Sequence, residues 1–129
     1  MIYLDTSALL KLVVPETHSD ALRAWLQQQT DQYVSSVLLT IETRRALQRE
    51  APTQLPRADL LLTRVGQVGL THAVVEAASR LPSPDLRSLG AIHLATALLL
   101  REEVTSFVSY DKRLLAAAQA ERLPVVSPD

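Results

Sequence analysis

The sequence predicts an α/β fold of three layers, in which a short parallel sheet is flanked by helices on both faces. Short β-prone runs alternate with segments of helical periodicity along the chain, which is the pattern of strands joined by crossover helices. The 129 residues are about the size of one domain, so we expect residues 1–129 to form a single domain. Apolar residues make up 47% of the chain and charged residues 21%, the ordinary mix for a globular protein.

The first expected elements are a strand and a helix joined by an acid. Residues 2–4 form a β-prone run that ends at Asp5. Residues 6–12 are predicted to form a helix that stops near a proline, which has no amide hydrogen to continue it. A second helix is expected after Thr17, because Thr17 and the acid three residues later resemble a capping box.

The middle of the chain is predicted to contain a second strand, at residues 32–36. Ser36 then stands where it can cap a helix that runs to about Glu50. Chain breakers and helical periodicity beyond this point predict, in order, a loop at 52–57, a helix at 58–68, a short strand at 70–71 and a helix at 73–80.

The last third of the chain carries the clearest strand. After a proline-rich break, residues 88–101 form a strongly apolar helical segment. Residues 105–110 alternate in the manner of a strand, and Asp111 begins one more helix. Residues 125–126 are expected to add a short edge strand.

Composition excludes several classes of site. The formal net charge is -1, so any binding of nucleic acid requires local clustering of cations. The absence of cysteine excludes disulfides, thiolate zinc sites and a cysteine nucleophile. No apolar run approaches the roughly 18 residues of a membrane span, and residues 1–14 do not read as a signal peptide. We therefore expect a cytoplasmic protein with no membrane partner.

Two acids fall at equivalent junctions between a strand and a helix. Asp5 follows the first strand and Asp111 follows the clearest later strand. Because the carboxyl ends of parallel strands meet at one edge of a sheet, both carboxylates could share a site there. The alternative is that each aspartate simply caps its helix.

A third acid, Glu42, lies on the apolar stripe of its predicted helix, in one row with Leu38 and Ala46. Glutamate is rarely buried unless it is paired, so Glu42 either forms an ion pair with Arg45 or points into a cleft. Several ionised carboxylates at one place require a proton or a cation among them. Oxygen-only ligands suit Mg²⁺ or Mn²⁺, which serve phosphate chemistry.

Four segments in order resemble the motifs of PIN-domain proteins, and most closely those of the VapC toxins of bacterial toxin–antitoxin pairs. These segments are residues 1–9, 35–42, 86–97 and 107–114. The resemblance implies a PIN-like (Rossmann-like) fold and a Mg²⁺- or Mn²⁺-dependent endoribonuclease that cuts tRNA or ribosomal RNA and so stops translation. It also implies a homodimer that is silenced by a VapB antitoxin, whose C-terminal segment blocks the acidic site.

The resemblance assigns roles to particular residues. Asp5, Glu42 and Asp111 match the acids of the family, with Asp5 and Asp111 as metal ligands and Glu42 as a ligand directly or through water. Ser7 matches a hydroxyl position near the metal or the scissile phosphate. Among the basic residues, Arg45, Arg87 and Arg113 are candidates for RNA phosphate contacts, as are Arg49 and Lys112; a solvated basic face is the alternative for each.

Gly90 departs from the pattern, because the third motif usually has an acid at this position. Near the start of a helix an aspartate is favoured by roughly 0.3–1 kcal/mol, whereas glycine in a helix costs about 1 kcal/mol relative to alanine. We interpret Gly90 as an acid lost by substitution, which predicts weak metal binding and reduced or absent cleavage while antitoxin binding survives.

Two alternatives to this nuclease remain open. The first is a non-catalytic PIN module that binds an antitoxin or a dimer mate, which Gly90 favours. The second is a Mg²⁺-dependent phosphatase, although the chain lacks an aspartate two residues beyond Asp5. His93, one turn after Gly90 among apolar residues, is expected to be a buried and satisfied histidine rather than a general base.

Overall fold

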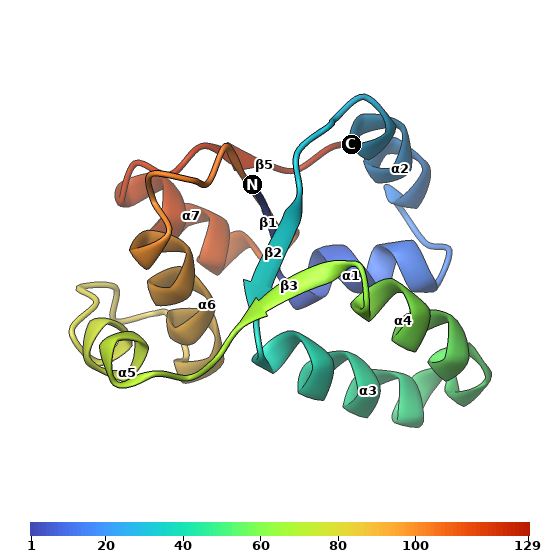
Figure 1. The fold of residues 1–129 in the computed structure, drawn as a ribbon, viewed down its shortest axis with the longest axis horizontal. Helices are drawn as coiled ribbons and strands as arrows, with labels where there is room; N and C mark the ends of the chain where they lie inside the picture. The colour runs from blue at the N-terminus through green and yellow to red at the C-terminus, as the bar shows by residue number, and fades with distance from the viewer.

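The computed structural model describes residues 1–129 and contains one fully parallel five-stranded sheet (Figure 1). Its strands are β1 (Ile2–Leu4), β2 (Tyr33–Ser36), β3 (Val65–Val68), β4 (Ser106–Val108) and β5 (Val125–Val126), in the spatial order β3-β2-β1-β4-β5. The apolar run of β1 is at most 1% exposed because this strand lies in the centre of the sheet and is covered on both faces.

Seven α-helices and one 3₁₀ turn connect the strands. They are α1 (Thr6–Val13), α2 (Ser19–Gln27), α3 (Leu38–Glu50), the 3₁₀ turn η1 (Pro52–Gln54), α4 (Leu55–Leu62), α5 (His72–Ser79), α6 (Ser88–Leu99) and α7 (Lys112–Ala120). None of these helices combines the length and the apolar character that crossing a bilayer requires.

The sheet separates two apolar cores, one on each face. Ile2 and Leu4 of β1 pack with residues of α1 to α4, whereas Tyr3 between them packs with residues of α6 and α7. Alternate side chains of a strand point to opposite faces, so this division follows directly from the pleat. Figure 1 shows the resulting layers, with α1 to α4 on one side of the strands and α5 to α7 on the other. The predicted three-layer α/β fold is confirmed.

The strand order reverses at β1. The chain proceeds from β1 through β2 to β3 in one direction, and then returns to place β4 and β5 on the other side of β1. In open parallel sheets, the carboxyl edge at such a reversal is where ligands bind. Here the residues that directly follow the two adjacent strands are Asp5 after β1 and Ser109 after β4.

The prediction was wrong between residues 52 and 71. The predicted helix at 58–68 ends at Leu62, and Val65–Val68 instead form β3 alongside β2. No strand forms at 70–71, and the predicted loop at 52–57 contains η1 and the start of α4. The helical periodicity extends past Leu62, but pairing with β2 outweighs this local preference. A proline in the first turn of α4 also favours a helix start rather than a loop.

The predicted caps are confirmed only in part. Ser36 Oγ accepts a hydrogen bond of 3.1 Å from the amide of Leu38, the first residue of α3. The capping box at Thr17 is wrong, because α2 begins at Ser19 and its N-cap, His18, takes a left-handed conformation with φ 71° and no side-chain cap. The hydroxyl of Ser19 stabilises the turn before α2 instead, where it accepts a hydrogen bond of 3.0 Å from the amide of Glu16.

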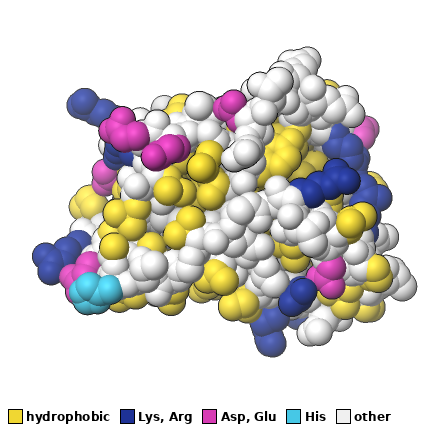
Figure 2. All heavy atoms as spheres, in the orientation of Figure 1, with side chains coloured by type: hydrophobic (Ala, Val, Ile, Leu, Met, Phe, Trp, Pro, Cys, Tyr) yellow, Lys and Arg dark blue, Asp and Glu magenta, His cyan; other side chains and the backbone are white.

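Charged side chains on the face drawn in Figure 2 are scattered around its periphery and form no extended field of one sign. This distribution agrees with the small net charge. Recognition of an anion therefore depends on local groups of cations, two of which are described below.

The packing of α2 yields a test of the core. Leu22 is fully buried, so Leu22→Ala should lower the free energy of unfolding by about 2–5 kcal/mol. Leu60 in α4 is 61% exposed, and Leu60→Ala should change the free energy of unfolding by less than about 0.5 kcal/mol. Urea denaturation of both variants checks this pair, and an equal effect of the two changes would contradict the assigned core.

Candidate functional site

The two aspartates at the carboxyl edge of the sheet are both helix caps. Asp5 Oδ1 accepts a hydrogen bond of 3.0 Å from the amide of Ala8 at the start of α1. Asp111 Oδ1 accepts from the amides of Arg113 at 3.0 Å and Leu114 at 3.1 Å at the start of α7. The capping interpretation is therefore confirmed for both acids. Capping also fixes each carboxylate at the edge where β1 and β4 end.

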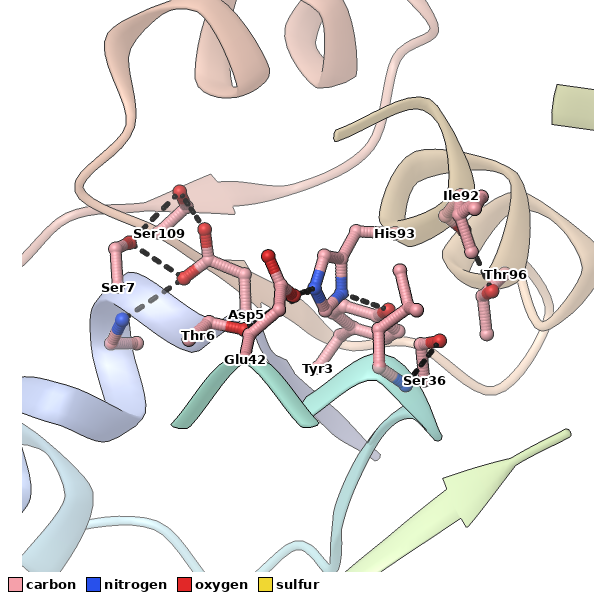
Figure 3. Close-up of polar contacts among 12 residues, drawn as sticks. Tyr3, Asp5, Thr6, Ser7, Ser36, Glu42, Ile92, His93, Thr96 and Ser109 are labelled. Atoms are coloured by element: carbon pink, nitrogen blue, oxygen red, sulfur yellow. Dashed lines mark hydrogen bonds and ion pairs between the residues drawn. The ribbon is translucent and has the colours of Figure 1, made fainter. Parts of the chain in front are cut away.

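Asp5 is buried and its carboxylate is surrounded by donors. Only 3% of the residue is exposed. Ser7 Oγ donates to Oδ1 at 2.7 Å, and Ser109 Oγ donates to Oδ2 at 2.6 Å (Figure 3). Burial raises the pKa of Asp5 above its ordinary value, and the hydrogen bonds from Ser109, Ser7 and the Ala8 amide only partly oppose this shift.

Two hydroxyls join the β1–α1 junction to the β4–α7 junction. Besides donating to Asp5, Ser109 Oγ accepts from the amide of Asp111 at 3.0 Å. Ser7 Oγ in turn accepts from the amide of Tyr110 at 2.8 Å. Ser7 and Ser109 thus link the Asp5 carboxylate to the backbone of the β4–α7 junction, including the amide of Asp111, but no hydrogen bond joins the carboxylates of Asp5 and Asp111. Sequence reasoning missed Ser109, although a hydroxyl between a strand and the capping Asp111 was a visible signal.

Glu42 reaches the same region from α3 but has different partners. Its Oε1 accepts from Thr6 Oγ1 and from His93 Nε2, both at 2.8 Å. Burial raises its pKa, but the hydrogen bonds from His93 and Thr6 outweigh this effect and the pKa is lowered. The alternative ion pair with Arg45 is wrong: Arg45 is exposed to solvent and forms no ion pair, and Glu42 contacts His93 instead.

His93 is 3% exposed, as expected for a buried and satisfied histidine. Its Nδ1 lies 2.8 Å from Tyr3 Oη, and its Nε2 also lies 3.4 Å from Thr6 Oγ1. The sequence offered no sign that α6 would place this ring against Glu42, 51 positions earlier in the chain. Thr6 was likewise not predicted as a partner.

Gly90 and Asp111 line one hollow of about 410 Å³, together with Leu86 and three cations. The cations are Arg87, Lys112 and Arg113. A Cβ atom at position 90 would lie 2.8 Å from Leu86 Cδ1, so Leu86 occupies part of the space that a larger side chain would need. The crowding atom is the end of a flexible side chain, which a modest rotation of Leu86 can move.

A second, separate hollow has a volume of about 370 Å³. Thr6 and Glu42 line it together with Arg45 and Arg49 from α3. None of the cations that line the two hollows takes part in an ion pair, whereas most other cations of the chain are held by acids or backbone carbonyls. Asp111 in the first hollow and Glu42 in the second therefore each lie beside cations whose charge no carboxylate neutralises, whereas Asp5 lines neither hollow.

The candidate ligands are of the chemical type that a hard divalent ion prefers, but too few of them lie close together. The candidate ligands are carboxylate oxygens, which Mg²⁺ and Mn²⁺ prefer. However, no three side chains among the aspartates, glutamates and histidines lie close enough together to hold an ion. Both oxygens of Asp5 already accept hydrogen bonds from the protein, and Gly90 supplies no ligand. These residues, as arranged here, fit a weak site at most.

Sequence comparison relates nearly the whole chain to one family. Residues 2–123 match the PIN domain. The chain is 42% identical to Ribonuclease VapC35 of Mycobacterium tuberculosis over 131 residues, which cover 99% of this chain and 97% of that protein. It is 40% identical to Ribonuclease VapC47 of the same species over 132 residues, which cover 99% and 97% of the two proteins.

Solved structures share the fold at low sequence identity. A toxin–antitoxin complex from Klebsiella pneumoniae gives a TM-score of 0.78 at 20% identity, covering 100% of this chain and 98% of that one. VapC20 of Mycobacterium tuberculosis, a sarcin-ricin loop cleaving toxin, gives 0.74 at 18% identity, with 91% and 95% covered. VapBC2 from Rickettsia felis, bound to promoter DNA, gives 0.72 at 15% identity, with 100% of both chains covered.

The buried carboxylate predicts a dependence of stability on pH. Because the pKa of Asp5 is raised in the folded state, the folded chain binds its proton more tightly than the unfolded chain does. In metal-free buffer, Asp5 should therefore lower stability progressively as the pH rises from its ordinary pKa of 3.8 through its raised value. Asp5→Asn can keep the cap on α1 and should be more stable than the parent at neutral pH.

Urea denaturation with a chelator, from acidic to neutral pH, measures this difference. The advantage of Asp5→Asn should shrink as the pH falls and vanish below 3.8. Asp85→Asn, in an exposed loop, controls for the removal of one negative charge. Equal or lower stability of Asp5→Asn at neutral pH would contradict the raised pKa.

Proposed function

Because the chain belongs to the PIN-domain family and is a VapC-like member of it, we propose that it is the toxin of a toxin–antitoxin system and acts as an endoribonuclease weakened by Gly90. The observation that carries this proposal is the placement of Asp5 and Asp111 on either side of Ser109, at the carboxyl edge where the strand order reverses. Relatives that share about two-fifths of the sequence are named ribonucleases.

Cellular RNA, either tRNA or ribosomal RNA, is the substrate we propose. A structural neighbour described as a sarcin-ricin loop cleaving toxin supports this class of substrate. The two hollows would receive phosphates on either side of the acids, through Arg45 in one and Arg87 and Arg113 in the other. Contacts of this kind position a strand and do not read its sequence.

Mg²⁺ or Mn²⁺ is the proposed cofactor, with Asp5 and Asp111 as ligands and Glu42 as a ligand directly or through water. Such an ion would polarise a phosphoryl oxygen of the substrate. The chain's own contribution is to orient the acids: Ser7 and Ser109 hold the two oxygens of Asp5, and the amides of α7 hold Oδ1 of Asp111. Ser7 therefore acts in this proposal as the hydroxyl that fixes Asp5.

Gly90 limits this activity in the proposal. It removes an acid beside Asp111, and Leu86 fills part of the space left in that hollow. The same observation supports the alternative of a non-catalytic PIN module, whose role is to bind an antitoxin or a dimer mate. The fully hydrogen-bonded Asp5 carboxylate also favours that alternative.

The proposed partners follow from the structural neighbours. Several of these are complexes of a toxin with its antitoxin, which supports a VapB-like antitoxin as the protein partner. We propose further that the chain acts in the cytoplasm as a homodimer, as its resemblance to VapC toxins implies. An antitoxin that covers the hollow beside Gly90 would not need the missing acid.

Restoring the acid tests the nuclease. Gly90→Asp should increase the cleavage of RNA in Mg²⁺ or Mn²⁺ by about tenfold or more, which needs only about 1.4 kcal/mol of added transition-state stabilisation. Gly90→Asn is the matched control, because it displaces Leu86 in the same way but adds no charge. Gel analysis of tRNA and ribosomal RNA, with products that end in 3′-hydroxyl and 5′-phosphate, measures the effect.

Each other outcome of this experiment has a defined meaning. Full and equal activity with Gly90 and Gly90→Asp would show that position 90 is not needed. Absence of cleavage by both proteins would contradict the nuclease and favour the binding module. Adding Asp5→Asn to Gly90→Asp should abolish the gain, because the ion would lose a charged ligand.

A further inference from the structure

The carboxylate of Glu42 is held from one side only. Both of its hydrogen bonds, from Thr6 Oγ1 and His93 Nε2, end on Oε1 at 2.8 Å. No hydrogen bond reaches Oε2, and the side chain keeps 24% of its surface exposed. Figure 3 shows Glu42 between Thr6 and His93, beside Asp5. One oxygen is therefore anchored to the protein while the other is free for a ligand.

Hydrogen-bond chemistry assigns the donor in the contact between His93 and Glu42. An ionised carboxylate only accepts hydrogen bonds, so His93 Nε2 must be the donor to Glu42. On the other side of the ring, His93 Nδ1 lies 2.8 Å from Tyr3 Oη, so a hydrogen bond with this hydroxyl holds the ring in place. Burial raises the pKa of Tyr3, so its hydroxyl keeps the proton that this arrangement requires.

The far end of this chain of hydrogen bonds is rigid. Tyr3 is fully buried in the central strand, and its ring stacks on Phe107 of β4 with centroids 5.2 Å apart. His93 is 3% exposed on α6. The hydrogen-bonded chain from Tyr3 through His93 to Glu42 thus connects the centre of the sheet to an acid on α3, and both ring nitrogens of His93 have a partner.

We propose that His93 is a positioning residue: with its Nδ1 held by Tyr3, it donates from Nε2 to Oε1 of Glu42 and so presents Oε2 toward the acids at the sheet edge. This inference rests on the proposed nuclease function and assigns that function a residue which does not touch the substrate. Outer partners of this kind orient the groups that do the chemistry, and their loss typically costs about 10–100-fold in activity or metal affinity.

Two substitutions of similar size and polarity separate positioning from structure. In His93→Gln the side-chain amide nitrogen can replace Nε2 and still donate to Glu42. In His93→Asn the shorter amide can reach only toward Tyr3, so the donor to Glu42 is lost. Both remove the ring, and both should lower stability to a similar extent.

NMR spectroscopy tests the positioning without any need for activity. Long-range proton–nitrogen correlations of the His93 ring in the native chain should show the Nε2–H form. The Glu42 side chain should keep one rotamer in the native protein and in His93→Gln, and become averaged in His93→Asn. A ring in the Nδ1–H form, or a Glu42 rotamer that is unaffected in His93→Asn, would overturn the proposal.

RNA cleavage supplies the second measurement, in the native chain and in Gly90→Asp. We expect His93→Asn to lower the turnover number by about 10–100-fold and His93→Gln to retain most of it. Equal losses in the two variants would overturn the proposal in favour of a purely structural role. If neither background cleaves RNA, the nuclease proposal fails by itself, and the NMR result still decides the role of His93.

Discussion

A buried carboxylate at the point of strand reversal is the constraint on which the rest of the site depends. Asp5 is almost free of solvent contact, and its ionisation is tolerated only with hydrogen bonds on both oxygens. Those donors come from α1 and from the segment after β4, so satisfying Asp5 also holds these two segments together. The hydrogen bonds that satisfy the buried carboxylate of Asp5 therefore also fix the geometry of this edge of the sheet.

The same constraint explains why capping and function are not competing interpretations. Asp5 and Asp111 each satisfy amides at the start of a helix, and each keeps its position because of that role. A capping aspartate at the end of a parallel strand is therefore already at the place where a ligand meets the sheet. Under the proposed function, the same carboxylates would both cap a helix and serve the chemistry.

The sequence was sufficient to predict most of the fold and the position of the acids at the sheet edge. Strand β1 and the junctions at Asp5 and Asp111 were predictable because local propensity and tertiary placement agree there. Strand β3 was missed because its pairing with β2 overrides the periodicity around it. The pairing of His93 with Glu42 was missed for a different reason: contacts between distant helices leave no trace in local pattern.

The glycine at position 90 has a consequence for how such a chain can lose its chemistry. Replacing Asp5 or Asp111 by alanine leaves amides at a helix start without their acceptor, at a cost of about 0.5–2 kcal/mol for each lost cap. Position 90 lines a hollow that Leu86 partly fills, and it holds no helix-capping group. Under the proposed function, a chain that lacks the acid at position 90 still keeps both helix caps, so it can stay folded and bind a partner after its cleavage activity is lost.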